Sequence, residues 1–171
     1  DAAEQEAETV RIAMVQTNRG VEQLRKLRKK GPEAQVEDFV RLSAQTLARD
    51  PDIDVLVWPE GSLRGSARHP TSRSARRLVR DTGVELWTGG GAWRKSEGAR
   101  RVFFNSGFRL SRSTVDGSRR VETGPRYDKN ILLPFGEFMP LKDLIPVLGK
   151  IQGVGNYEAG DGLVDYETPH G

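Results

Sequence analysis

Two short apolar runs with a helical pattern between them are the feature that most constrains the fold of this chain. Val10–Thr17 and Ile53–Trp58 carry β-branched and apolar residues on both faces, which is typical of buried strands. Between them, apolar residues recur at helical spacing, and Pro32 and Asp50-Pro51 mark where the helix begins and ends. This strand–helix–strand order predicts an α/β fold rather than an all-β fold.

The same order continues along the chain. A short helix is predicted over Thr71–Thr82, and a third strand over Val84–Thr88. Val102–Leu110 and Arg119–Glu122 then predict a hairpin that turns at an Asp-Gly pair. The chain is therefore expected to add paired strands to an α/β layer.

The two ends of the chain carry weaker patterns. Residues 1–9 are polar and predict a tail or linker, which leaves 10–171 as one domain. Leu141–Leu148 predicts a short apolar helix, and the glycine-rich stretch after it predicts a loop with at most one strand, at Leu163–Tyr166.

Composition excludes several classes of protein. The 171 residues include no cysteine and two histidines, so a disulfide framework, a thiolate metal site and a cysteine nucleophile within this chain are excluded. We expect neither a metal nor another cofactor. No apolar run approaches the ~20 residues that span a bilayer, and the acidic start does not resemble a signal peptide.

Arginine-rich clusters account for the net charge of +3. They occur at residues 25–30, 64–80 and 109–120. A solvated helix face is the favoured interpretation, and phosphates of nucleic acid or of lipid headgroups are the alternative. Because no aromatic residues of the kind that stack on bases accompany these clusters, no nucleic-acid partner is expected.

Glu60 is the first candidate for chemistry. It follows Ile53–Trp58 through Pro59, at the end of a predicted strand, where open α/β sheets often place their ligand crevices. We expect the carboxylate to be held rigidly and desolvated there, as suits a general base. The alternative is a surface glutamate in an ordinary turn.

Lys129 and Glu137 are the second candidates. Lys129 lies among polar neighbours just before the apolar run Ile131–Leu133, and Pro-Phe-Gly-Glu follows, ending at Glu137. An ammonium group in such a place can stabilise a developing oxyanion, with Glu137 holding or polarising it. The alternative is a solvated surface ion pair, which would contribute little. Spacing alone does not decide between these readings.

Taken together, the segments resemble the nitrilase (carbon–nitrogen hydrolase) superfamily. Val10–Asn18 is similar to its opening strand, Asp54–Glu60 (DVLVWPE) to its first catalytic segment, and Asn105–Phe108 to a later strand. Tyr127–Leu141 (YDKNILLPFGEFMPL) carries the strongest resemblance, and its PFGEFMPL ending favours the apolipoprotein N-acyltransferase branch. The fold implied is the N-terminal part of an α-β-β-α sandwich.

The resemblance also implies a chemistry. Glu60 would be the general base and Lys129 the stabiliser of the tetrahedral intermediate in a Glu–Lys–Cys triad, and Glu137 would be an additional active-site glutamate. Such an enzyme moves an acyl chain from a phospholipid, through a thioester, to the amino group of a diacylglyceryl-cysteine lipoprotein. It would act at the periplasmic face of the bacterial inner membrane, and Leu141–Ile151 is a candidate membrane-facing arm or an ordinary packed segment.

The chain departs from that pattern because the cysteine is missing. We therefore expect a fragment, inactive by itself, whose nucleophile lies outside this chain, in preference to a degenerate homologue. A missing half-sandwich would leave apolar surface for a partner chain or a dimer, or would lower solubility. Two alternatives remain: a soluble amidase of the same superfamily, and a catalytically inactive nitrilase-like binding module.

Overall fold

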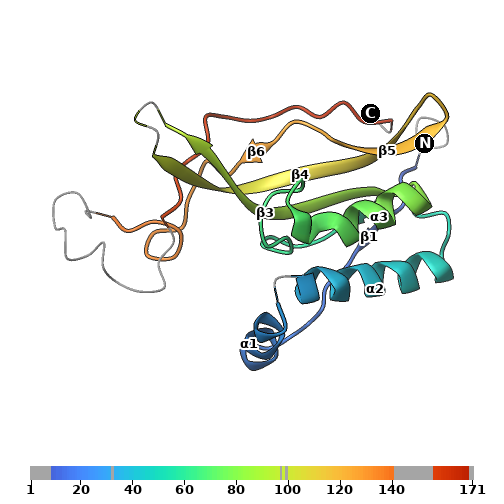
Figure 1. The fold of residues 1–171 in the computed structure, drawn as a ribbon, viewed down its shortest axis with the longest axis horizontal. Helices are drawn as coiled ribbons and strands as arrows, with labels where there is room; N and C mark the ends of the chain where they lie inside the picture. Colours follow the sequence, from blue (N-terminus) through green and yellow to red (C-terminus); the bar gives the residue numbers. More distant parts are fainter. Residues whose placement is uncertain (1–8, 32, 97, 99, 141–155, 170–171) are drawn as a thin grey trace, which may run out of the picture.

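The computed structural model describes residues 9–31, 33–96, 98, 100–140 and 156–169. They form a mixed β-sheet with its helices on one face (Figure 1). In chain order the elements are β1 (Ile12–Met14), α1 (Val21–Lys29), α2 (Glu33–Arg49), β2 (Val55–Val57), the 3₁₀-helix η1 (Pro70–Ser72), α3 (Arg73–Thr82), β3 (Glu85–Lys95), β4 (Arg101–Val115), β5 (Ser118–Thr123) and β6 (Tyr127–Asp128). The predicted α/β class is confirmed.

The strands lie in the order β1-β2-β3-β4-β5, and β6 also pairs with β4. The first three are parallel, with Val55 of β2 opposite Ile12 of β1 and Glu85 of β3. From β3 onward the strands are antiparallel, and β3 and β4 form a long hairpin from Leu86↔Leu110 to Lys95↔Arg101. The carboxyl end of β2 therefore opens beside the middle of this hairpin.

The core lies between the sheet and helices α2 and α3. Each helix contributes a buried apolar stripe, including Val36 and Phe39 from α2 and Val79 from α3. Phe39 stacks on Trp58 with ring centroids 5.2 Å apart, and the Trp58 indole N–H donates to the Ser43 hydroxyl over 2.9 Å. Because Trp58 directly follows β2, this contact fixes the start of the loop that carries Glu60.

Polar and aromatic residues occupy the opposite face of the sheet. Glu85 and Arg109 form an ion pair of 2.5 Å there, and both side chains are almost fully buried. Beside them, Trp87 packs against Tyr166 with centroids 4.7 Å apart. Figure 1 shows the C-terminal segment, residues 156–169, crossing this face. The segment thus covers one part of the face that the helices leave open.

Strand β1 differs from the prediction. The sequence predicts a strand buried on both faces, yet Ile12 and Met14 are 61% and 84% exposed. Only the side chains between and after them, Ala13 and Val15, contact the core. The prediction is wrong for the face that carries Ile12 and Met14, because no described residue packs over these two side chains closely enough to bury them.

Other differences concern element boundaries. Residues 25–29 of the first arginine-rich cluster lie on α1, and β3 runs to Lys95 rather than stopping at Thr88. Residues 163–166 form no strand, and Leu163 is exposed. The predicted helix Leu141–Leu148, like the candidate arm Leu141–Ile151, lies outside the described residues.

The helix over α2, the helix ending at Thr82 and the final hairpin are confirmed. The hairpin turns through Asp116 and Gly117, both at positive φ, as a two-residue turn requires. Of the helices described, none combines the length and hydropathy that a bilayer span requires.

The loop after β2 rests directly on the backbone of β3. A Cβ atom built on Gly90 would lie 2.5 Å from the Gly65 carbonyl oxygen and 2.8 Å from the Leu63 Cβ. The neighbouring Gly91 has open space at the same position. Only glycine at position 90 lets the loop and strand approach this closely.

We predict that Gly90→Ala lowers the free energy of unfolding by about 1–3 kcal/mol, because the added methyl group meets backbone atoms that must move. Gly91→Ala is the matched control and is expected to change it by less than about 0.5 kcal/mol. Urea unfolding of both variants measures the difference. Equal stability of the two would show that the loop does not pack on β3 as described.

Candidate active site

Glu60 is delivered by the tight loop that leaves β2. The Trp58 N–H donates to the Trp87 carbonyl over 2.8 Å, and the Leu63 N–H donates to the Gly89 carbonyl over 3.0 Å. Between these two anchors the chain turns through Gly61, at a φ of 69° that favours glycine. The carboxylate is thereby held over the β3–β4 hairpin.

Lys129 follows β6 and is fixed through its backbone. Its N–H donates to the Asn105 carbonyl on β4 over 2.8 Å, and its own carbonyl accepts from the Gly160 N–H over 3.0 Å. A side chain at Gly160 would collide with the Asp128 carbonyl, so glycine is needed for this contact. Lys129 is therefore held between β4 and the C-terminal segment.

Glu137 sits in a compact turn that folds back on itself. Its N–H donates to the Leu133 carbonyl, and its carboxylate accepts from the Leu133 N–H, each over 2.8 Å. Its carbonyl accepts from the Tyr157 N–H over 3.0 Å. The side chain is only 12% exposed, so the turn presents a nearly buried carboxylate to Lys129.

The three predicted side chains converge. The Lys129 ammonium lies 3.0 and 2.9 Å from the two carboxylate oxygens of Glu137 and 3.7 Å from Glu60. The side-chain amide of Asn105 donates to both carboxylates, over 2.5 Å to Glu137. The structure thus joins residues 69 positions apart into one cluster, which we call the carboxylate–ammonium cluster: Glu60, Asn105, Lys129 and Glu137.

The electrostatics of the cluster keep Lys129 and Glu137 charged. Burial alone would raise the pKa of Glu137, but the Leu133 N–H, the Lys129 ammonium and the Asn105 amide together lower this pKa to about 2. The pKa of Lys129 is raised, first by its hydrogen bond to Glu137 and also by the charge of Glu60. At neutral pH Lys129 is therefore a fixed cation and not a base.

Glu60 differs from the expectation in one respect. The sequence predicts a desolvated carboxylate, whereas its side chain is 62% exposed. The prediction of burial is wrong because the turn carries the side chain past the end of β2, where Asn105 and Lys129 contact it but no described apolar residue covers it. Its exposed part faces a groove.

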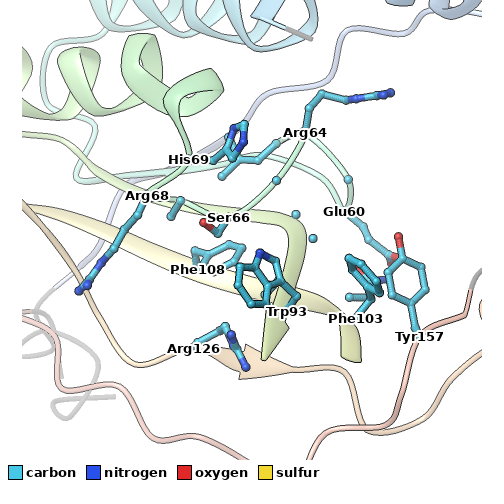
Figure 2. Close-up of a pocket in the computed structure, with 18 of the residues that line it drawn as sticks. Glu60, Arg64, Ser66, Arg68, His69, Trp93, Phe103, Phe108, Arg126 and Tyr157 are labelled. Atoms are coloured by element: carbon cyan, nitrogen blue, oxygen red, sulfur yellow. The ribbon is translucent and has the colours of Figure 1, made fainter. Parts of the chain in front are cut away.

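This groove has a volume of about 1160 Å³ and adjoins the cluster. In the view of Figure 2, Glu60, Phe103 and Tyr157 lie at one side, Trp93 and Phe108 in the middle, and Arg68 at the other side. Its lining combines aromatic side chains, four arginines and the two carboxylates of the cluster. A molecule with apolar and anionic parts would fit such a lining.

Asn105 is a member of the cluster that sequence reasoning missed. It lies inside a strand pattern, between the large apolar residues Phe104 and Phe108, and its two contacts are to Glu60 and Glu137, which lie far from it in the sequence. Among the described residues, no group of three His, Cys, Asp or Glu side chains is placed to hold a metal ion.

The chain is similar in sequence to known acyltransferases. The chain is 30% identical over 165 residues to apolipoprotein N-acyltransferase of Geobacter metallireducens, covering 94% of the chain and 29% of that protein. It is also 30% identical over 119 residues to apolipoprotein N-acyltransferase of Caulobacter vibrioides, covering 67% of the chain and 21% of that protein. The chain thus spans less than a third of the length of these relatives. No family model matches the chain.

Among solved structures, a carbon–nitrogen hydrolase from Helicobacter pylori aligns with a TM-score of 0.51 at 16% identity. The alignment covers 89% of this chain and 45% of that one, and at this identity it establishes the fold alone. The fold is therefore part of the carbon–nitrogen hydrolase sandwich. Together with the sequence relatives, it supports the nitrilase superfamily, and within it the apolipoprotein N-acyltransferases, as the family of this chain.

We predict that Glu137 makes the free energy of unfolding depend on pH. Its folded pKa of about 2 lies below the ordinary value of 4.5, so the stabilisation is complete above pH ~4.5 and is lost as pH falls toward 2. By this linkage the contribution of Glu137 to the free energy of unfolding is at most about 3 kcal/mol. Urea unfolding of wild type and Glu137→Gln between pH 6 and pH 2 measures it.

The two proteins should differ most at pH 6 and converge toward pH 2. Glu122→Gln, which alters an exposed glutamate on β5, is the control and should follow the wild type throughout. A difference between wild type and Glu137→Gln that does not shrink with acid would contradict the ionised, hydrogen-bonded state of Glu137.

Proposed function

We propose that this chain is part of an apolipoprotein N-acyltransferase, an acyltransferase of the nitrilase superfamily. Such an enzyme would transfer an acyl chain from a phospholipid to the N-terminal diacylglyceryl-cysteine of a lipoprotein. The observation that carries the proposal is the convergence of Glu60 and Lys129, 3.7 Å apart, in a chain whose sequence relatives bear that name.

The geometry favours different roles for the two glutamates. Glu137 is nearly buried, accepts hydrogen bonds from three donors and has a pKa of about 2, so it is a poor proton acceptor. Glu60 is exposed to the groove, and in the part of the chain that the structure describes its carboxylate accepts from the Asn105 amide and lies 3.7 Å from the Lys129 ammonium. Glu60 is therefore the proposed general base, and Glu137 orients Lys129.

Lys129 is the proposed stabiliser of the tetrahedral intermediate. Because its ammonium is already oriented by Glu137 and fixed through its backbone, it needs little rearrangement when negative charge develops on the substrate oxygen. Its raised pKa keeps it cationic throughout.

The reaction would use a cysteine supplied by the rest of the enzyme. Its thiol would give a proton to Glu60 while the sulfur attacks the ester carbonyl, and Glu60 would return that proton to the departing lysophospholipid oxygen. The lipoprotein amine would then attack the thioester, form the amide and release the thiol, with Glu60 relaying the amine proton. By itself this chain lacks the nucleophile and is expected to be inactive.

The substrates set the location and partners that we propose. A phospholipid donor and a lipidated acceptor both reside in a membrane, so the domain would work at the periplasmic face of the bacterial inner membrane. The exposed side chains Ile131, Leu133 and Phe135, next to the cluster, suit an apolar environment.

In the complete enzyme, we predict that Glu60→Gln and Lys129→Ala each lower the rate of lipoprotein N-acylation by at least about a hundred-fold, because one removes the base and the other the stabilising charge. Mass spectrometry of the acceptor measures acylation, and thermal unfolding checks that the fold is retained. Glu122→Gln is the matched control and should keep full activity, because Glu122 is exposed on β5 and its side chain does not line the groove. Wild-type rates in either cluster variant would refute the proposed function.

A further inference from the structure

The groove beside the cluster carries positive charge that its own residues leave unneutralised. The arginines that line it are Arg64, Arg68, Arg101 and Arg126. Arg126 pairs with Asp128 over 2.7 Å, but in the described part of the chain the other three have no carboxylate within ion-pair distance. Among the described residues that line the groove, the acids are Glu60 and Glu137, and both pair with the Lys129 ammonium. An anionic ligand would complete this arrangement.

Among these arginines, Arg101 has a guanidinium group that is already held in position to bind an anion. Its guanidinium lies over the Trp93 ring, 4.5 Å from the centroid. Stacking fixes the plane of the guanidinium and leaves its N–H groups free at the edge, where they match the oxygens of a phosphate. Because Trp93 is 47% exposed, the pair stands at the groove surface and not in the core.

A continuous surface joins this pair to the cluster. Trp93 pairs across the hairpin with Phe103, which also lines the groove and is 46% exposed. The Phe103 carbonyl accepts from the Glu158 N–H, in the segment that also hydrogen-bonds to Glu137. The aromatic wall therefore ends at the cluster, as Figure 2 shows for Trp93, Phe103 and Glu60.

The spacing suits one particular class of ligand. Arg101 and Asn105 lie four residues apart on the same face of β4, which is about 13 Å at a strand rise of ~3.3 Å per residue. The arginine side chain and the glycerol unit of a phospholipid together bridge such a span. An ester carbonyl can then lie at Lys129 while the phosphate lies at Arg101 and an acyl chain contacts the aromatic wall.

We propose that Arg101, held on Trp93, binds the phosphate of the acyl donor and so selects phospholipids over neutral acylglycerols. The proposal rests on the proposed function, because it takes the groove beside the cluster as the donor site. Arg101 is a specificity residue and does not touch the reacting carbonyl.

Calorimetric titration of the 171-residue chain tests the proposal without requiring catalysis. The two ligands are dihexanoyl phosphatidylglycerol and dihexanoylglycerol, which share acyl chains and differ by the phosphoglycerol headgroup. The readout is the ratio of their affinities, in which contributions of the acyl chains cancel. We expect the wild type to prefer the phospholipid by about ten-fold or more, as charge-assisted hydrogen bonds to phosphate predict.

Arg101→Gln should lower this ratio by about ten-fold, and Arg101→Lys should restore only part of it because lysine lacks the planar pair of donors. Trp93→Leu should lower the ratio while the charge is retained, and should have no further effect once Arg101→Gln is present. Arg77→Gln is the matched control: it removes the same charge from an exposed site on α3 outside the groove, and should leave the ratio unchanged.

Three results would overturn the proposal. Equal affinity of the wild type for the two ligands would exclude a phosphate site. An equal loss of the ratio in Arg77→Gln would show a general effect of charge. The third result is that the wild type binds inorganic phosphate, loses this binding in Arg101→Gln, and shows no preference for the phospholipid. The site would then bind free phosphate and not the acyl donor. A different result would separate the two proposals. If the chain prefers the phospholipid but the complete enzyme does not transfer acyl groups, the proposed function is contradicted and the phosphate site is retained.

Discussion

Burial of the Glu137 carboxylate is the constraint on which the site depends. A charge that is nearly withdrawn from water must be compensated, and three groups from separate segments do this: the Leu133 N–H, the Lys129 ammonium and the Asn105 amide. Each donor lies on a different part of the chain, so compensating one carboxylate brings the turn, the end of β6 and the middle of β4 together. Glu60 is then the one acid of the cluster left available to the groove.

The sheet supplies the frame for this convergence. Parallel pairing of β1, β2 and β3 places the end of β2 beside the β3–β4 hairpin, and antiparallel pairing of β6 with β4 places Lys129 opposite it. Helices α2 and α3 cover only the other face, where Trp58 is anchored by Phe39 and Ser43. The chemistry and the main apolar core thus occupy opposite faces of one sheet, and the cluster can be charged without weakening the core.

Sequence patterns predicted the parts of this arrangement that depend on local order. The alternation of strands and helices gave the α/β class, and Glu60, Lys129 and Glu137 stood out because each adjoins an apolar run or a glycine–proline turn. Asn105 could not be found in this way, since it contacts Glu60 and Glu137, which come from segments far from it in the sequence. The exposure of Ile12 was also beyond local reasoning, because an apolar run does not say whether both faces of its strand will be covered.

The contact between the loop after β2 and the glycines of β3 limits which residues can be substituted without moving Glu60. A Cβ atom on Gly89 would lie 2.8 Å from the Glu60 Cα, so backbone rests on backbone with no side chain between them to adjust. This contact therefore ties the backbone position of Glu60 to the sheet. Substitutions that retain this contact can fall on other residues of the groove, such as Trp93, which is 47% exposed.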